Sequence, residues 1–105
     1  MGDGNFQTKE RKTNMAIKRK RIIFSGRVQG VGFRYRASYA ADSLGLTGWV
    51  KNEWDETVSM EVQGEEELID KLVERMYKER YIRIEGISVM NMPLVEGEKK
   101  FSIKY

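Results

Sequence analysis

Apolar residues alternate with polar residues along several short stretches of the chain, as expected for strands with one buried face. The clearest case places Val58, Met60 and Val62 among polar neighbours, and Gly64 ends the stretch. A short apolar run at residues 22–24 indicates another strand. The predicted strands cover residues 20–27, 47–52, 57–63, 81–90 and 99–104.

Apolar residues recur at three- and four-residue spacing in two other stretches, which predicts amphipathic helices. The first covers residues 33–44 and is followed by Gly45, a residue type that commonly ends helices. The second opens with three glutamates at residues 65–67, which place negative charge at the positive end of the helix dipole. The expected buried stripes are Phe33, Ala37, Ala40, Ala41 and Leu44 on the first helix, and Leu68, Ile69, Leu72, Val73 and Met76 on the second.

The order of these elements is β-α-β-β-α-β with a short final strand. It predicts an α+β ferredoxin-like sandwich, in which two helices cover one face of an antiparallel sheet. This fold hosts many unrelated functions, so it does not identify an activity. Residues 18–105 are expected to form one domain, and the polar, aperiodic residues 1–17 are expected to be a disordered tail or extension.

The composition limits the chemistry and the partners. The 105 residues include no cysteine and no histidine, so thiolate nucleophiles, disulfides and imidazole bases are excluded. Residues 1–21 carry seven Lys or Arg and two acids, whereas residues 22–105 carry twelve and fourteen, so the folded part lacks the basic excess of a nucleic-acid-binding domain. No apolar run approaches the roughly 20 residues of a membrane span, and no signal-peptide pattern opens the chain. We therefore expect a cytoplasmic protein without a nucleic-acid or membrane partner.

A glycine-rich connection between the first strand and the first helix is a candidate anion site. It contains Gly26, Gly30 and Gly32, and Arg34 follows on the first turn of the helix. Glycine permits positive φ and close approach of a ligand to the main chain, and N–H groups at a helix N-terminus attract anions. The loop matches neither the dinucleotide fingerprint nor the P-loop. The alternative is a simple turn, with Arg34 in a surface ion pair.

Asn52 is a second candidate, at the end of the second predicted strand. A carboxamide donates and accepts hydrogen bonds at once, so it can hold a water molecule. The alternative is a polar residue that merely favours the start of a turn.

Two stretches together resemble the signatures of the acylphosphatase family. Residues 26–34, G-R-V-Q-G-V-G-F-R, are similar to the family pattern G-x-V-Q-G-V-x-F-R. Residues 48–52, G-W-V-K-N, together with Val58 and residues 62–64, are similar to the second pattern, G-W-V-[K/R]-N-x₃-G-x-V-x₅-G. The separation of the signatures and the order of elements fit as well, so the resemblance covers about residues 18–105.

The resemblance implies a small hydrolase of acyl phosphates that uses no metal and no cofactor. The Arg34 side chain would bind the phosphate and stabilise the transition state, and Asn52 would orient the attacking water. Inorganic phosphate would be product and inhibitor, and we expect a monomer. The backbone amides that would cradle the phosphate belong to Gln29, Gly30, Val31, Gly32, Phe33 and Arg34.

The available residue types favour activated phosphates independently of the resemblance. Phosphoryl transfer needs mainly positioning and electrostatic stabilisation. An acyl phosphate releases a carboxylate, whose conjugate acid has a pKa of about 4 by analogy with aspartate and glutamate, so its departure needs no general acid. A phosphate monoester would release a far more basic alkoxide, which this site offers nothing to protonate.

The alternative function is a non-catalytic ferredoxin-like module that binds an anion, RNA or a protein. RNA-binding members of this architecture stack bases on aromatic residues of the strands, and the expected outward positions of the first and third strands carry no aromatic pair. A further alternative is an accessory acyl-phosphate or carbamoyl-phosphate site within a larger system.

One departure from the family pattern lies in the turn between the second and third strands. The pattern has glycine there, whereas in this chain Glu56 follows Asp55. Glutamate supports positive φ poorly, so we expect a strained turn at a distance from Arg34.

Overall fold

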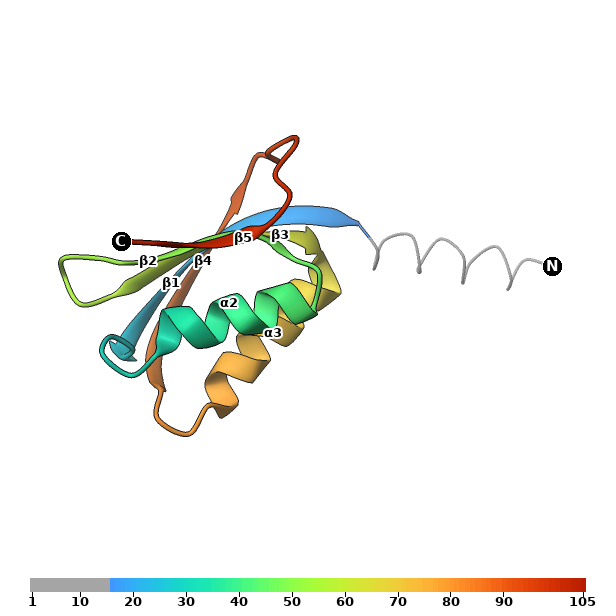
Figure 1. The fold of residues 1–105 in the computed structure, drawn as a ribbon. Coiled ribbons are helices and arrows are strands. Elements are labelled where there is room, and N and C mark those ends of the chain that lie inside the picture. The colour runs from blue at the N-terminus through green and yellow to red at the C-terminus, as the bar shows by residue number, and fades with distance from the viewer. Residues whose placement is uncertain (1–15) are drawn as a thin grey trace.

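The computed structural model describes residues 16–105, so the predicted tail lies outside the described residues except for Ala16 and Ile17. Five strands and two helices follow in the predicted order (Figure 1). The first strand begins at Ile17, three residues before the predicted start, and the other boundaries shift by at most a few residues. The elements are β1 (Ile17–Arg27), α2 (Phe33–Ser43), β2 (Thr47–Asn52), β3 (Val58–Glu65), α3 (Glu66–Lys78), β4 (Arg83–Met92) and β5 (Phe101–Lys104).

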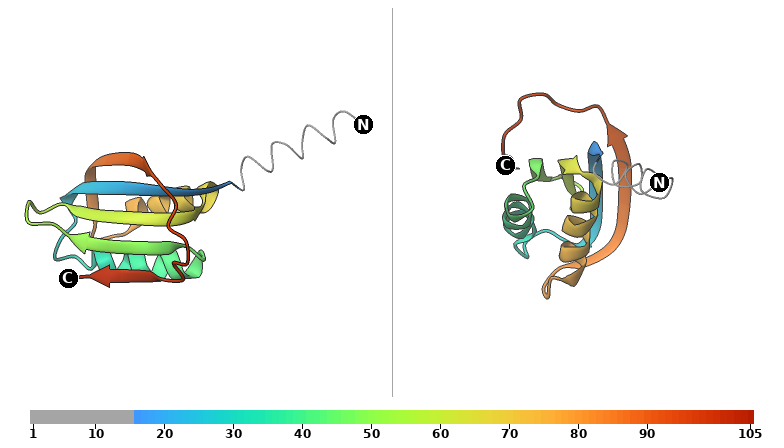
Figure 2. Two further views of the ribbon diagram at one scale, coloured as in Figure 1. Left: turned by 90° about the horizontal axis from the view of Figure 1, so that it is seen from above. Right: turned by 90° about the vertical axis from the view of Figure 1, so that its right-hand side faces the viewer.

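The strands form one sheet in the order β4-β1-β3-β2-β5, and both helices cover the same face (Figure 2). This is the predicted ferredoxin-like α+β fold, with one difference. The sheet is mixed, because β5 pairs in parallel with β2, whereas all other neighbours are antiparallel. The segment between β4 and β5 crosses the sheet, because these consecutive strands form its two opposite edges.

The core lies between the sheet and the two helices. Phe33, the first residue of α2, is 2% exposed and packs against Phe24 of β1, with ring centroids 4.9 Å apart. This contact anchors the start of the helix to the sheet. The predicted stripes are confirmed in most positions: Phe33, Ala37, Ala40, Ala41, Ile69, Leu72 and Met76 are buried, and Leu44, Leu68 and Val73 pack against the core while partly exposed.

On the opposite face of the sheet, a buried arginine binds the segment that crosses from β4 to β5. Arg19 of β1 is 3% exposed, and it donates hydrogen bonds of 2.8 Å to Glu61 of β3 and to Glu98 in the crossing segment. Burial acts to lower the pKa of Arg19, but hydrogen bonds and charge interactions with Glu98 and Glu61 outweigh it and raise the pKa. Gln63 adds hydrogen bonds to both backbone polar groups of Val95. These contacts hold the crossing segment on the sheet and thereby position β5.

The described residues contain no helix of the length and apolar character that crossing a membrane requires.

The turn between β2 and β3 contains Glu56 in the left-handed region, with φ 73°. Apart from glycines, no other described residue has a positive φ. Asp55 stabilises the turn, because its carboxylate accepts hydrogen bonds from the hydroxyl and the backbone N–H of Thr57. These bonds hold the pKa of Asp55 below its ordinary value. The predicted strain therefore lies at Glu56 itself, since the left-handed region costs an L-residue about 1–2 kcal/mol.

We expect Glu56→Gly to raise the free energy of unfolding by about 0.5–1 kcal/mol. The gain in the folded state is partly offset by the greater freedom of glycine in the unfolded chain. Urea denaturation measures the change, and Glu56→Ala is the matched control, because it removes the same charge but keeps the Cβ atom. Equal stabilities of the two variants would show that backbone strain at this position is negligible.

Candidate active site

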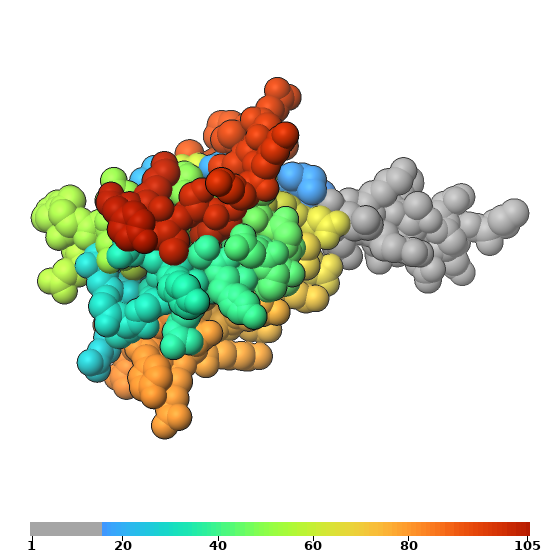
Figure 3. Space-filling model, in the orientation of Figure 1, coloured from blue at the N-terminus to red at the C-terminus, as the bar shows by residue number. Residues whose placement is uncertain are grey.

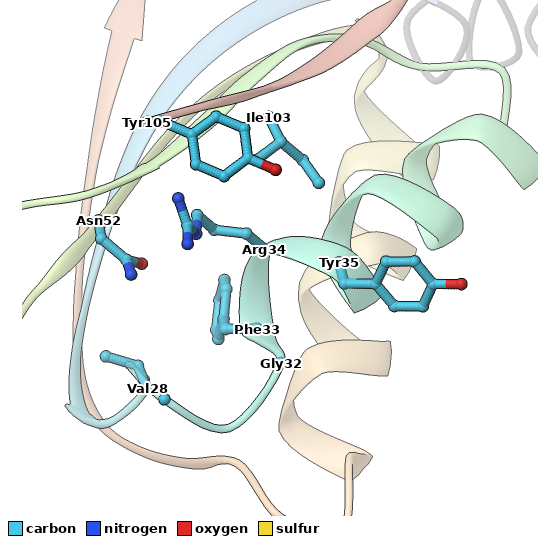
Figure 4. Close-up of a pocket in the computed structure, with 9 residues that line it drawn as sticks. Val28, Gly32, Phe33, Arg34, Tyr35, Asn52, Ile103 and Tyr105 are labelled. Carbon is cyan, nitrogen blue, oxygen red and sulfur yellow. The ribbon is translucent and has the colours of Figure 1, made fainter.

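A pocket of about 210 Å³ opens where the start of α2, the end of β2 and the end of the chain meet. Helix α2 contributes Arg34, and the facing wall contains Asn52 of β2 (Figure 4). The C-terminal strand and the start of α2 lie side by side on the molecular surface (Figure 3). The complete lining is Val28, Gly30, Gly32, Phe33, Arg34, Tyr35, Asn52, Ile103 and Tyr105.

The loop before α2 lines this pocket with Gly30 and Gly32 and ends at the N-terminus of the helix. Gly30 and Gly32 both have left-handed backbones, with φ 73° and 79°, and Gly32 is the N-cap of the helix. The first N–H groups of an α-helix have no partner within the helix. No side chain caps them here, and the first turn of α2 contains no acidic residue. The helix end is therefore available to an anion.

Arg34 lies on the first turn of α2 and is partly exposed. One of its terminal nitrogens donates a 3.0 Å hydrogen bond to the backbone carbonyl of Lys104, and its guanidinium carbon lies 4.8 Å from the centre of the Tyr105 ring. These two contacts orient the guanidinium without neutralising it. No carboxylate within residues 16–105 forms an ion pair with Arg34, so the surface ion pair considered as its alternative is absent from that range.

Asn52 is the last residue of β2 and is paired with Val58 of β3. Its side chain is partly exposed and points into the pocket from the side facing Arg34 (Figure 4). The two residues come together because β1 and β2 both flank β3, which places the loop after β1 and the end of β2 at one end of the sheet.

Only some of the other residues predicted to cradle the phosphate line this pocket. Gly30, Gly32 and Phe33 line the pocket, whereas the Gln29 side chain points elsewhere and Val31 lines a neighbouring pocket. Gly26 has a structural role: a Cβ atom there would collide with the backbone carbonyl of Arg83 on β4.

Gln29 joins the loop to the β2–β3 turn. Its amide nitrogen donates 2.8 Å hydrogen bonds to the carbonyl oxygens of Glu53 and Thr57, the residues at the base of that turn. Glu53 follows Asn52 directly, so the Gln29 side chain fixes the spacing between the glycine loop and Asn52. Nothing in the local sequence around Gln29 indicates this contact, because its partners are backbone atoms 24 and 28 residues away.

The sequence reasoning also missed Ile103 and Tyr105 as parts of the pocket wall. They reach it because β5 runs parallel to β2 and ends beside Asn52. The sequence predicted an antiparallel sheet, and that prediction did not place the end of the chain beside Asn52.

Known proteins with this arrangement are found by sequence and by structure. Residues 20–103 match the family model described as Acylphosphatase. An acylphosphatase of Clostridium beijerinckii is 45% identical over 84 residues, which are 79% of this chain and 93% of that protein. The crystal structure of acylphosphatase from Bacillus subtilis is similar with a TM-score of 0.78 and 40% identity, covering 86% of this chain and 100% of that chain. An acylphosphatase from Coxiella burnetii gives a TM-score of 0.76 at 29% identity, covering 84% and 93%.

The fold and the pocket thus define a class: a small α+β enzyme with a pocket where an uncapped helix N-terminus lies beside an arginine. The chain belongs to the acylphosphatase family, and its reaction is the hydrolysis of acyl phosphates.

Proposed function

We propose that the pocket beside α2 hydrolyses acyl phosphates to carboxylate and inorganic phosphate by in-line attack of water on phosphorus, without a metal ion. The observation that carries this proposal is the meeting of three groups in one pocket: the start of α2, the Arg34 guanidinium and the Asn52 carboxamide. The proposal assigns one role to each of them.

The phosphate group binds at the start of α2. Backbone N–H groups from Gln29 to Arg34 surround its oxygens, and the guanidinium of Arg34 donates two hydrogen bonds to them. In a pocket of this kind the donors stabilise the charge on the phosphoryl oxygens throughout the transfer, at little reorganisation cost. The contacts of Arg34 with Lys104 and Tyr105 support this role, because a guanidinium that is already oriented loses less freedom on binding.

Asn52 holds the attacking water. Its side chain can accept a hydrogen bond from the water while donating another from its amide nitrogen. It faces Arg34 across the pocket, and the water must approach phosphorus from the side opposite the leaving carboxylate (Figure 4). Gln29 supports this assignment, because it ties Glu53, the neighbour of Asn52, to the phosphate loop.

The carboxylate leaves unprotonated, so the reaction needs no general acid. The chain has no histidine or cysteine to supply one. Among residues 16–105, no three acidic side chains gather in a way that could hold a metal ion. The phosphate itself accepts the proton that the attacking water loses.

We further propose that the enzyme acts as a cytoplasmic monomer on small acyl phosphates, with inorganic phosphate as a product that also inhibits. The outward positions of β1 and β3 carry charged, polar and aliphatic side chains such as Arg21, Ile23 and Glu61, which speaks against base stacking.

The test of this function is hydrolysis of benzoyl phosphate by the purified protein in the presence of EDTA, beside p-nitrophenyl phosphate. We expect rapid hydrolysis of benzoyl phosphate, competitive inhibition by inorganic phosphate, and no turnover of the ester. A folded sample that hydrolyses benzoyl phosphate no faster than buffer would leave only an anion-binding site.

The roles of Arg34 and Asn52 predict different kinetic changes. Arg34→Ala should lower kcat by at least about 10²–10³ and weaken inhibition by phosphate, because it removes both a binding group and transition-state stabilisation. Asn52→Ala should lower kcat by a similar factor while the inhibition constant of phosphate stays near the wild-type value. Steady-state kinetics with benzoyl phosphate, with phosphate as inhibitor, measures both.

Arg36→Ala is the matched control for Arg34→Ala. Arg36 lies on the same helix, two residues further, but it forms an ion pair with Glu79 at 2.9 Å and does not line the pocket. Its replacement should leave the kinetics within a few-fold of wild type. A folded Arg34→Ala enzyme with the activity of Arg36→Ala would refute the role of Arg34, and a large rise in the phosphate inhibition constant of Asn52→Ala would make Asn52 a phosphate-binding residue.

A further inference from the structure

A second pocket, of about 230 Å³, lies on the other side of the glycine loop and contains three arginines. Arg27 ends β1, Arg80 lies in the connection after α3, and Arg83 begins β4. Val31 and Ile82 supply apolar parts of the wall, and Tyr81 completes the lining. The side chains of the three arginines are exposed to solvent.

These three arginines differ from the others of the described chain in having no protein acceptor. Within residues 16–105, no hydrogen bond or ion pair joins the guanidinium group of Arg27, Arg80 or Arg83 to another side chain or to a carbonyl. The guanidinium carbon of Arg80 lies 5.6 Å from the centre of the Tyr81 ring. The remaining arginines, Arg19, Arg21, Arg34, Arg36 and Arg75, each have at least one such acceptor.

The sheet register makes this cluster costly for the free protein. Arg27 and Arg83 are direct partners in the antiparallel β1–β4 pair. Like charges that face each other across neighbouring strands destabilise a sheet. This repulsion between arginines exists in a domain that is rich in carboxylates, because residues 22–105 carry two more acids than bases. Glu56 and Glu85 line a neighbouring pocket together with Arg27, but no carboxylate lines the pocket that the three arginines share. Guanidinium groups gathered around a pocket without carboxylates suit a multiply charged anion.

We propose that Arg27, Arg80 and Arg83 bind a diphosphate group, carried by inorganic pyrophosphate or by a nucleoside diphosphate. Three guanidinium groups match the three or more negative charges and the paired oxygens of a diphosphate better than they match a single carboxylate. This site is separate from the catalytic pocket, because the two pockets share no lining residue.

The position of Val31 connects the two pockets. Val31 lines the arginine pocket, and its neighbours Gly30 and Gly32 line the catalytic pocket. A ligand in the arginine pocket therefore rests against the back of the loop that holds the substrate phosphate. Occupancy restrains this loop and changes the affinity of the enzyme for acyl phosphates.

The test is an NMR titration of ¹⁵N-labelled Arg34→Ala protein with sodium pyrophosphate at constant ionic strength. This background weakens the catalytic phosphate site and needs no turnover, so its result does not depend on the proposed hydrolysis. We expect saturable shifts of the amides of Tyr81, Ile82 and Arg83, which lie outside the loop assigned to the substrate phosphate. The absence of saturable shifts at these amides overturns the proposal.

Two double variants in the same background decide whether the arginines are responsible. Arg27→Gln/Arg83→Gln should weaken pyrophosphate binding at least tenfold, and its melting temperature should be equal or higher because the facing like charges are gone. Lys71→Gln/Arg75→Gln removes two charges from α3, outside the pocket, and should bind as before. Equal losses of pyrophosphate affinity in both variants would show that binding depends only on the net charge of the protein, and they would contradict the proposed site.

If the double variant Arg27→Gln/Arg83→Gln does not fold, the single variant Arg83→Gln takes its place, and Arg75→Gln becomes the control. Titration with ADP distinguishes the sources of the diphosphate group. Shifts with ADP of the same size as those with pyrophosphate support a nucleotide ligand, and shifts with pyrophosphate alone support the inorganic anion.

Discussion

The contact between Phe33 and Phe24 fixes the start of α2 against the sheet, and the pocket proposed as the active site depends on it. A helix end attracts an anion only where its N–H groups are free and its direction is fixed. Phe33 supplies the fixed direction, because it is the first residue of the helix and is almost fully buried. Gly32 leaves the N–H groups without a side-chain cap, and Arg34, which follows Phe33, faces the pocket. One buried ring thus positions both the backbone and the side-chain donors.

Two long-range connections complete the pocket around this helix end. Gln29 binds the loop to the base of the β2–β3 turn and so sets the position of Asn52. On the far face of the sheet, Arg19 binds the segment that crosses from β4 to β5. This segment delivers β5, whose end supplies the Lys104 carbonyl and the Tyr105 ring to Arg34. The site therefore depends on polar contacts whose partners are far apart in sequence, while the core alone fixes the layers.

The sequence predicted the parts of the molecule that local patterns determine. Alternation at Val58, Met60 and Val62 identified β3, the helical stripes identified both helices, and the strand predicted at residues 47–52 placed Asn52 at its end. The strain at Glu56 was also expected, since the family pattern has glycine at this turn and glutamate supports a positive φ poorly. The parallel pairing of β5 and the contacts of Gln29 were not predictable in this way, because each joins segments whose proximity is a property of the whole fold. The boundary at Ile17 was missed because the charged residues that follow it conceal the alternation of β1.

The central claim is that water held by Asn52 attacks phosphorus in a phosphate bound by Arg34 and the start of α2. Hydrolysis of benzoyl phosphate in ¹⁸O-labelled water, followed by mass spectrometry of both products, tests it most directly. The account predicts one ¹⁸O atom in the inorganic phosphate and none in the benzoate. Label in the benzoate would mean attack on the carbonyl carbon, and it would contradict the assignment of the pocket to phosphoryl transfer.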